Sequence, residues 1–167
     1  RGIWGTSATN AWLVGDNGTI MKWDGSVWTP QASGVTVSLN GIWGADANNV
    51  WVVGSDGIIL KWNGATWTPQ TSGTTEILSG VWGTSNNNIW AVGDAGTILR
   101  WNGTAWTMQP GGSTTFWYGV SGTDANNVWL VGQTGGIAHW DGSALTSPLR
   151  PTFKIIVRVW ASDANHV

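Results

Sequence analysis

The sequence predicts an all-β fold of the β-propeller class, built from 39-residue blades of four strands each. The first observation is a repeat, because tryptophans and glycines coincide when the sequence is shifted by 39 residues. The aligned positions are Trp12, Trp51, Trp90 and Trp129; Trp23, Trp62, Trp101 and Trp140; and Gly15, Gly54, Gly93 and Gly132. The second is that each repeat consists of short apolar stretches separated by glycine turns. A period of this length, made of strands and turns, is typical of propellers.

A third observation is the nearly continuous apolar character of the second and third predicted strands, as at residues 50–53 and 58–60. A strand that is apolar on both faces must be covered on both faces. In a propeller each blade is packed between two neighbours, which supplies that cover. The pattern therefore favours radial packing of the repeats over one flat sheet in water.

Each repeat divides into four predicted strands in the same order. In the first repeat the strands are expected at residues 2–5, 11–15, 19–23 and 26–31, and a Ser-, Gly- and Thr-rich connection follows. Strands of four to six residues are ordinary. The blades are expected at about residues 2–40, 41–79, 80–118 and 119–157, with 158–167 starting the next repeat. We expect four blades plus the first strand of a fifth, in a single propeller domain over 1–167 or a segment of a larger one.

The second glycine turn of each repeat carries an Asn-Gly or Asp-Gly pair, which favours a two-residue type I′ hairpin. These pairs are Asp24-Gly25, Asn63-Gly64, Asn102-Gly103 and Asp141-Gly142. In that register Trp62 faces Ala65 and Leu60 faces Trp67, which makes the two tryptophans diagonal neighbours. The earlier turn, as at residues 15–18, fits either a two-residue turn or a three-residue turn with a glycine bulge.

The fourth repeat departs from the pattern. Ser121 and Leu145 stand where the other repeats have tryptophan, but the spacing persists as far as Trp160. Residues 158–161 repeat the role of residues 2–5, so a ring closed by these residues alone would have one first strand too many. We expect either a segment of a larger propeller or a chain that completes its ring with another copy.

Composition argues against several classes of function. Only 10% of the residues are charged, the formal net charge is −2 and there is no basic run, so we expect no nucleic-acid partner. No apolar run approaches the roughly 18 residues of a membrane-spanning helix. There is no cysteine, which excludes disulfides, and the sequence contains no segment typical of a signal peptide.

The polar residues favour turns over catalysis. All eight aspartates lie at predicted turns, where the side chain hydrogen-bonds its own backbone. His139 replaces Lys22, Lys61 and Arg100 in the repeat, and the other histidine, His166, lies near the end of the sequence. One interior histidine without repeated partners does not make a zinc site. We expect no catalytic residues, no metal and no cofactor, and hence no enzyme.

The high tryptophan content has two competing interpretations. Most of the 16 tryptophans are expected to pack the core, since each buried ring removes about 150–250 Å² from water. The functional alternative is an exposed ring that stacks on a sugar, with a neighbouring amide as hydrogen-bond partner. One such shallow site per blade would add avidity. The candidate ligand-binding residues, in the predicted outer strands, are Trp28, Trp67, Trp106, Gln31, Gln70 and Gln109.

The unit at residues 80–109 resembles two kinds of propeller repeat. One is the tryptophan-rich short repeat of large bacterial propellers, including those of myxobacteria, and the other is the blade of photosystem II assembly-factor-like propellers. The shared segments are VGDAGTIL at 92–99 and NGTAW at 102–106. The resemblance implies the fold. The basic patch expected of the photosystem-assembly relatives has no counterpart, because the seven Lys and Arg are spread along the chain.

Two functions follow as hypotheses. The first is a noncatalytic, lectin-like carbohydrate-binding module with one shallow site per blade, which predicts an extracellular or cell-surface location. The second is a structural or protein-interaction scaffold within a larger surface protein or assembly. The expected partners are glycans or another protein, with self-association that completes a ring.

Overall fold

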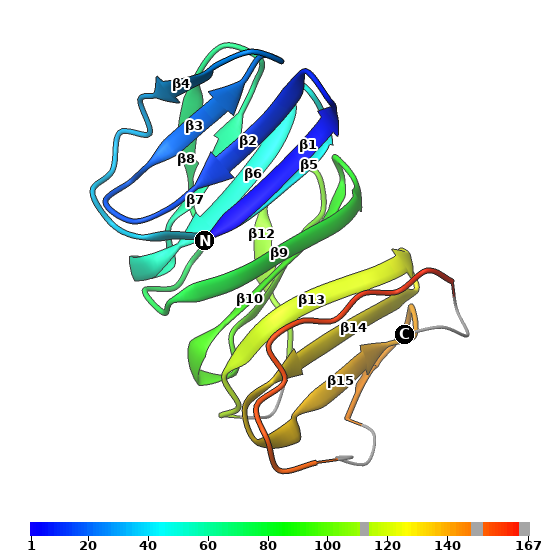
Figure 1. Ribbon diagram of the computed structural model, residues 1–167. Helices are drawn as coiled ribbons and strands as arrows, with labels where there is room; N and C mark the ends of the chain where they lie inside the picture. Colours follow the sequence, from blue (N-terminus) through cyan, green and yellow to red (C-terminus); the bar gives the residue numbers. More distant parts are fainter. Residues whose placement is uncertain (111–113, 148–151, 164–167) are drawn as a thin grey trace.

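The computed structural model of the protein describes residues 1–110, 114–147 and 152–163, which form an all-β fold (Figure 1). Within these residues the strands assemble into four sheets, each of four antiparallel strands in chain order. Each sheet corresponds to one 39-residue repeat, and successive sheets follow one another around an arc (Figure 1). The predicted all-β architecture with four strands per repeat is confirmed.

The strand bounds lie within a few residues of the predicted ones. Blade 1 contains β1 (Gly2–Ser7), β2 (Asn10–Val14), β3 (Ile20–Trp23) and β4 (Trp28–Gln31). Blade 2 contains β5 (Leu39–Asp46), β6 (Asn49–Gly54), β7 (Ile59–Trp62) and β8 (Trp67–Gln70). Blade 3 contains β9 (Leu78–Ser85), β10 (Asn88–Gly93), β11 (Ile98–Trp101) and β12 (Trp106–Met108). Blade 4 contains β13 (Trp117–Asp124), β14 (Asn127–Gly132), β15 (Ile137–Trp140) and β16 (Leu145–Thr146).

The type I′ turn predicted between the third and fourth strands is wrong. Trp62 pairs directly with Trp67 across the hairpin, so the loop has four residues and the two rings are opposite each other. Asn63 closes this loop by accepting the backbone N–H groups of Ala65 and Thr66 at 3.0 and 2.9 Å. Only Gly64 in the turn has positive φ, at 97°. The side chain of Asn63 replaces the backbone geometry that a type I′ turn would require.

The type I′ geometry is found instead at the earlier turn, between the second and third strands. In blade 2 this turn includes the short 3-10 element η1 (Ser55–Gly57), where Asp56 and Gly57 have φ values of 57° and 66°. The N–H of Ile58 donates to the Ser55 carbonyl at 3.1 Å, which closes a four-residue turn with two left-handed central residues. Blades 3 and 4 repeat it at η2 (Asp94–Gly96) and η3 (Gln133–Gly135). The two-residue option is correct for the turn itself. A bulge lies beside it, because the Gly54 N–H donates to the Ile58 carbonyl at 3.1 Å and the Ser55 N–H donates to Ser38 of the preceding connection.

In blade 4, Asp141 occupies the position of Asn63 in the turn between the third and fourth strands, and its hydrogen bonds predict a pH dependence of stability. Asp141 accepts three hydrogen bonds of 2.8 Å, from the backbone N–H groups of Ala144 and Ser143 and from the Ser143 hydroxyl. These bonds, that of Ala144 first, lower the pKa of Asp141 to about 2. The folded pKa lies below the ordinary value of 3.8, so this contribution to the free energy of unfolding is present above pH 3.8 and lost as the pH falls toward 2.

We therefore expect the free energy of unfolding to fall between pH 4 and pH 2, and Asp141→Asn to flatten that fall. The variant keeps an oxygen acceptor, as Asn63 and Asn102 do at the same turn in blades 2 and 3. Urea denaturation of both proteins at several pH values measures the two slopes. Equal slopes would show that the Asp141 carboxylate does not stabilise the folded protein.

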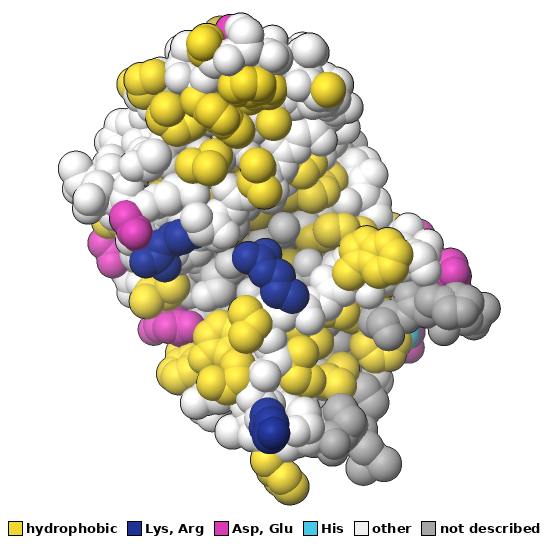
Figure 2. Space-filling view, viewed as in Figure 1, with side chains coloured by type: hydrophobic (Ala, Val, Ile, Leu, Met, Phe, Trp, Pro, Cys, Tyr) yellow, Lys and Arg dark blue, Asp and Glu magenta, His cyan; other side chains and the backbone are white. Residues whose placement is uncertain are grey.

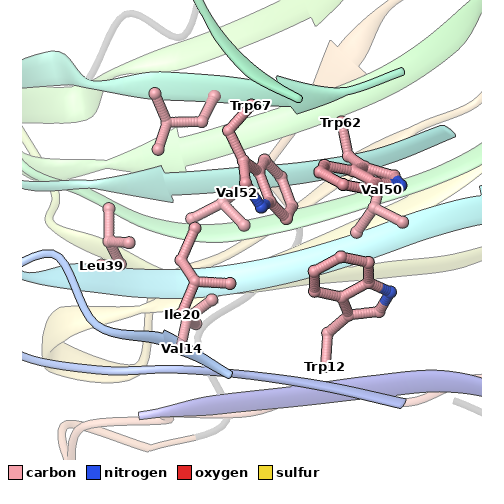
Figure 3. Close-up of a cluster of buried hydrophobic side chains, with 9 residues drawn as sticks. Trp12, Val14, Ile20, Leu39, Val50, Val52, Trp62 and Trp67 are labelled. Atoms are coloured by element: carbon pink, nitrogen blue, oxygen red, sulfur yellow. The ribbon is translucent and has the colours of Figure 1, made fainter. Parts of the chain in front are cut away.

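The core lies between the blades (Figure 3). The front face of a blade is defined here by the positions of Trp12, Val14 and Ile20 in blade 1. It packs against the rear face of the next blade, which in blade 2 consists of Val50, Val52, Leu60, Trp62 and Trp67. The same arrangement recurs between blades 2 and 3 and between blades 3 and 4. The predicted radial packing is confirmed, and so is the predicted core role of most repeated tryptophans.

The first strands of the blades lie against one another at the inner side of the arc (Figure 1). Each carries a glycine at the point of closest approach, because a side chain there would meet the neighbouring strand. A Cβ added at Gly41 would lie 3.3 Å from the Ser79 carbonyl oxygen and 3.3 Å from the Val81 nitrogen. The glycines at the start of each repeat therefore set the spacing of the blades.

Beyond blade 4, the chain returns to the inner side of the arc and runs beside β13 (Figure 1). The Ile156 N–H donates to the Gly132 carbonyl at 3.0 Å, which is the bond that Leu39 makes to Gly15 at the entry to blade 2. Residues 156–160 thus occupy the position of a fifth first strand, although they are not paired as a strand. The prolines at 148 and 151 and His166 lie outside the described residues.

Candidate binding surfaces

The three candidate tryptophans lie in the outermost strands, as predicted, but their environments differ. Trp67 is 9% exposed and Trp106 is 8% exposed, whereas Trp28 is 38% exposed. The ring of Trp67 packs edge-on against Trp12 of blade 1 at 5.3 Å, and that of Trp106 packs against Trp51 of blade 2 at 5.6 Å. Only Trp28 has an exposed ring among the three.

The candidate glutamines are engaged mainly by their own strands. The amide of Gln70 donates to the Thr68 hydroxyl at 3.3 Å, and that of Gln109 donates to the Thr107 hydroxyl at 3.1 Å. Gln31 makes the same contact at 3.5 Å with Thr29. A groove of about 350 Å³ brings Gln70 of blade 2 together with Trp106 of blade 3, so the pairing crosses a blade boundary. Carbohydrate binding at these residues stays a prediction.

Cations lie between the blades at a position that the sequence analysis did not assign. The Lys61 ammonium lies 4.9 Å from the Trp51 ring and 5.9 Å from the Trp101 ring of the next blade. Lys22 and Arg100 make equivalent contacts one blade before and one blade after. Such cation–π contacts contribute about 0.5–2 kcal/mol each. Three of the seven Lys and Arg residues therefore support the fold and are not free to form a binding patch.

In blade 4 the cation is replaced by His139, and the contact changes. The imidazole stacks on the Trp129 ring with centroids 4.1 Å apart, and its Nε2 lies 2.6 Å from the Asn127 Oδ1. The Trp129 Nε1 donates to the same oxygen at 3.1 Å. Within the described residues no cluster of three potential metal ligands occurs.

A hollow with polar lining, called the polar hollow from here on, lies where the first strands meet at the inner side of the arc. It comprises two adjacent cavities of about 260 and 290 Å³. Both are lined by Arg1, Asn40, Ser79, Tyr118 and Arg158. The first four are spaced by 39 residues and occupy one position in successive repeats, while Arg158 occupies the repeat position of Gly119. Four blades thus each contribute a different residue to the lining of one hollow.

The two arginines that line the polar hollow differ in whether a carboxylate neutralises their charge. The Arg1 guanidinium forms an ion pair with Asp16 at 2.6 Å and donates to the Asn40 Oδ1 at 3.1 Å. The hydrogen bond from Ser38 and then that from Arg1 lower the pKa of Asp16. Arg158 is exposed at the opening and has no ion-pair or hydrogen-bond partner among the described residues. The hollow therefore offers an unneutralised guanidinium beside an amide, a hydroxyl and a phenol.

The sequence analysis did not predict this hollow, because none of its residues forms a recognisable motif on its own. The sequence feature that marks the hollow is the variation of one position from repeat to repeat. The position after Arg1 is glycine in each of the four blades, whereas the Arg1 position itself becomes Asn40, Ser79 and Tyr118. Positions that serve the fold repeat, and a position that differs in every blade is available for recognition. No helix in the described part of the chain is long and apolar enough to cross a membrane.

Comparison with known proteins supports the fold. The sequence matches no model of a known protein family, and no curated protein matches it. Among solved structures, one described as YCF48 bound to D1 peptide matches with a TM-score of 0.70 and 17% identity, over 95% of this chain and 55% of that one. A computationally designed protein, Ika8, matches with a TM-score of 0.81 and 15% identity, over 96% of this chain and 52% of that one.

Other matches include WD40 repeats. The RRP9 WD40 structure has a TM-score of 0.72 and 12% identity, over 87% of this chain and 48% of the other. The chain thus spans about half the length of the structures that it matches. Shared arrangement at such low identity shows the fold alone. Four sheets in chain order, radial packing and these neighbours together identify the protein as a β-propeller of 39-residue, four-stranded blades.

Proposed function

We propose that the protein is a noncatalytic protein-interaction scaffold that binds an extended peptide segment at the polar hollow. The observation that carries this proposal is the convergence of non-repeating polar side chains from successive blades on one place. A binding site needs a few polar groups that fix orientation in a preformed concavity. Propellers of similar arrangement include one whose structure contains a bound peptide, which supports the same use here.

The chemistry of the hollow favours a segment with a carboxylate. Arg158 can bind a carboxylate through two parallel hydrogen bonds, and Tyr118 and Ser79 add hydroxyl groups nearby. The net charge of the chain is −2, so its overall field does not attract acidic ligands. Binding of an acidic peptide would therefore report a local site.

The test uses a fluorescein-labelled 12-residue peptide rich in Asp and Glu, and a Lys-rich peptide of equal length, in fluorescence polarisation at low salt. We expect the acidic peptide alone to bind, and Arg158→Ala to weaken it about tenfold, as loss of a charge-assisted pair does. Lys154→Ala is the matched control, because Lys154 is exposed and lies outside the cavities. Absence of binding, or an equal loss in both variants, would refute the proposal.

A further inference from the structure

The rear face of blade 1 is not covered by another blade among the residues that the structure describes. Leu13, Met21 and Trp23 occupy the positions of Val52, Leu60 and Trp62 in blade 2. In blade 2 these positions are almost fully buried beneath blade 1, but in blade 1 they are half-buried, and Trp28 and Ile3 beside them are exposed. Figure 2 shows hydrophobic side chains gathered over this sheet at the top of the view. The face has the composition of an interblade core without its cover.

Ring contacts show what is missing from this face. Trp62 in blade 2 is packed between its own partner Trp67 and two groups from blade 1, the Trp12 ring at 5.0 Å and the Lys22 ammonium at 5.4 Å. The equivalent Trp23 contacts Trp28 at 5.5 Å, and no second ring or cation contacts it among the described residues. In the three interblade contacts of this chain, the complement is a front face with a tryptophan and a Lys or Arg side chain.

The chain carries a similar front face at its other end, with a histidine at the position of the cation. Trp129, Val131 and Ile137 of blade 4 occupy the positions of Trp12, Val14 and Ile20, and His139 occupies that of Lys22. Residues 156–160 cover this face only in part and leave an apolar cavity of about 410 Å³. Two of their apolar side chains face solvent, since Trp160 is 73% exposed and Val157 is 56% exposed.

We propose that the rear face of blade 1 binds the front face of blade 4 in a second copy of this chain, so that two copies close one ring. The occupant is a second copy because the contact continues, position by position, an interface that the chain already forms three times. Contacts between two different faces of one molecule form closed rings when the rotation closes. Two copies of this chain also supply about the length of one matched structure.

Docking requires an exchange of first strands. The β1 strand of the incoming copy takes the position of residues 156–160, because both correspond to the start of a repeat. The incoming strand needs no further ordering, since β1 is already paired with β2, whereas residues 156–160 are not paired as a strand. Arg1 of the incoming copy then lies at the repeat position of Val157, with its guanidinium in an ion pair with its own Asp16. The exchange displaces Arg158, so the closed ring and the Arg158 peptide site are alternative states of the chain. The proposed ring does not depend on the proposed peptide binding. Fluorescence polarisation tests peptide binding at protein concentrations below those at which two copies associate.

The test is sedimentation velocity of the full chain from about 1 to 100 µM. We expect a species of twice the 17.7 kDa chain mass, and Leu13→Arg to weaken its formation at least tenfold. Val27→Arg is the matched control, because it adds the same charge to the same blade at a position whose counterparts Thr66, Ala105 and Ala144 are exposed. Circular dichroism at the lowest concentration establishes that both variants are folded.

A third variant tests the strand exchange. Ile156→Asp removes the apolar side chain that anchors residues 156–160 at blade 4, so we expect it to strengthen association several-fold. A chain that stays monomeric at 100 µM would assign the open face to another occupant and overturn the proposal. Equal effects of Leu13→Arg and Val27→Arg, or growth into open polymers, would overturn it as well.

Discussion

Replacing Trp51 by alanine is expected to lower the free energy of unfolding by about 3–5 kcal/mol, the range for removal of a large aromatic from a core. The indole is completely buried between blades 2 and 3. Its centroid lies 5.0 Å from that of Trp101 and 5.6 Å from that of Trp106, and the Lys61 ammonium lies above its ring. Alanine leaves a cavity, and it also removes the cation–π contact.

The matched control is Trp129→Ala, which removes the same residue from the same repeat position in blade 4. Trp129 is half-buried, and no complete blade covers it among the residues that the structure describes, so we expect a loss of no more than half that of Trp51→Ala. Urea denaturation followed by circular dichroism measures both. If Trp51→Ala leaves too little folded protein, Trp51→Phe should show an intermediate loss. Equal losses for Trp51→Ala and Trp129→Ala would show that burial between blades does not govern stability.

The fold was predictable from the sequence because its causes are local and repeated. Apolar residues on both faces of β6 and β7 require neighbours on both sides, and the 39-residue spacing supplies those neighbours in order. The second and third strands of each blade also end at turns that contain glycine. Because the local pattern and the global packing agree, a repeat fold of this kind can be predicted from its sequence.

The turn type was not predictable from the dipeptide alone. Asn63-Gly64 satisfies the residue preference of a type I′ turn, but the Asn63 side chain can also accept two backbone N–H groups and stabilise a longer loop. The outcome depends on the pairing of Trp62 with Trp67, which is favoured by the packing of both rings beneath blade 1. Tertiary contacts thus selected between two local solutions.

The binding surfaces were predictable only in part. Trp28 and Trp67 belong to equivalent strands, and their difference in exposure is set by whether a preceding blade covers them. That information is absent from either repeat considered alone. The polar hollow is similar, because Asn40, Ser79 and Tyr118 are far apart in the sequence and converge only when the first strands align. The variation at that position is the one sequence signal that could have identified it.

Replacing Gly57 by alanine is expected to lower the free energy of unfolding by more than about 3 kcal/mol. Gly57 is the second central residue of the type I′ turn, with φ at 66°, a conformation that costs other residues about 1–2 kcal/mol. The turn is also covered by the connection between blades 2 and 3. A Cβ at Gly57 would overlap the backbone carbonyl oxygen of Thr74, so the connection would have to move.

Gly73→Ala separates the two causes. Gly73 also has positive φ, at 78°, but no atom lies within 4 Å of the position that its Cβ would take. We therefore expect only the conformational cost of about 1–2 kcal/mol there, and the difference between the variants measures the steric contact with Thr74. Denaturant unfolding of both variants against the unmodified protein gives that difference. Equal losses would mean that the connection yields freely, and that Gly57 is required for its backbone angle alone.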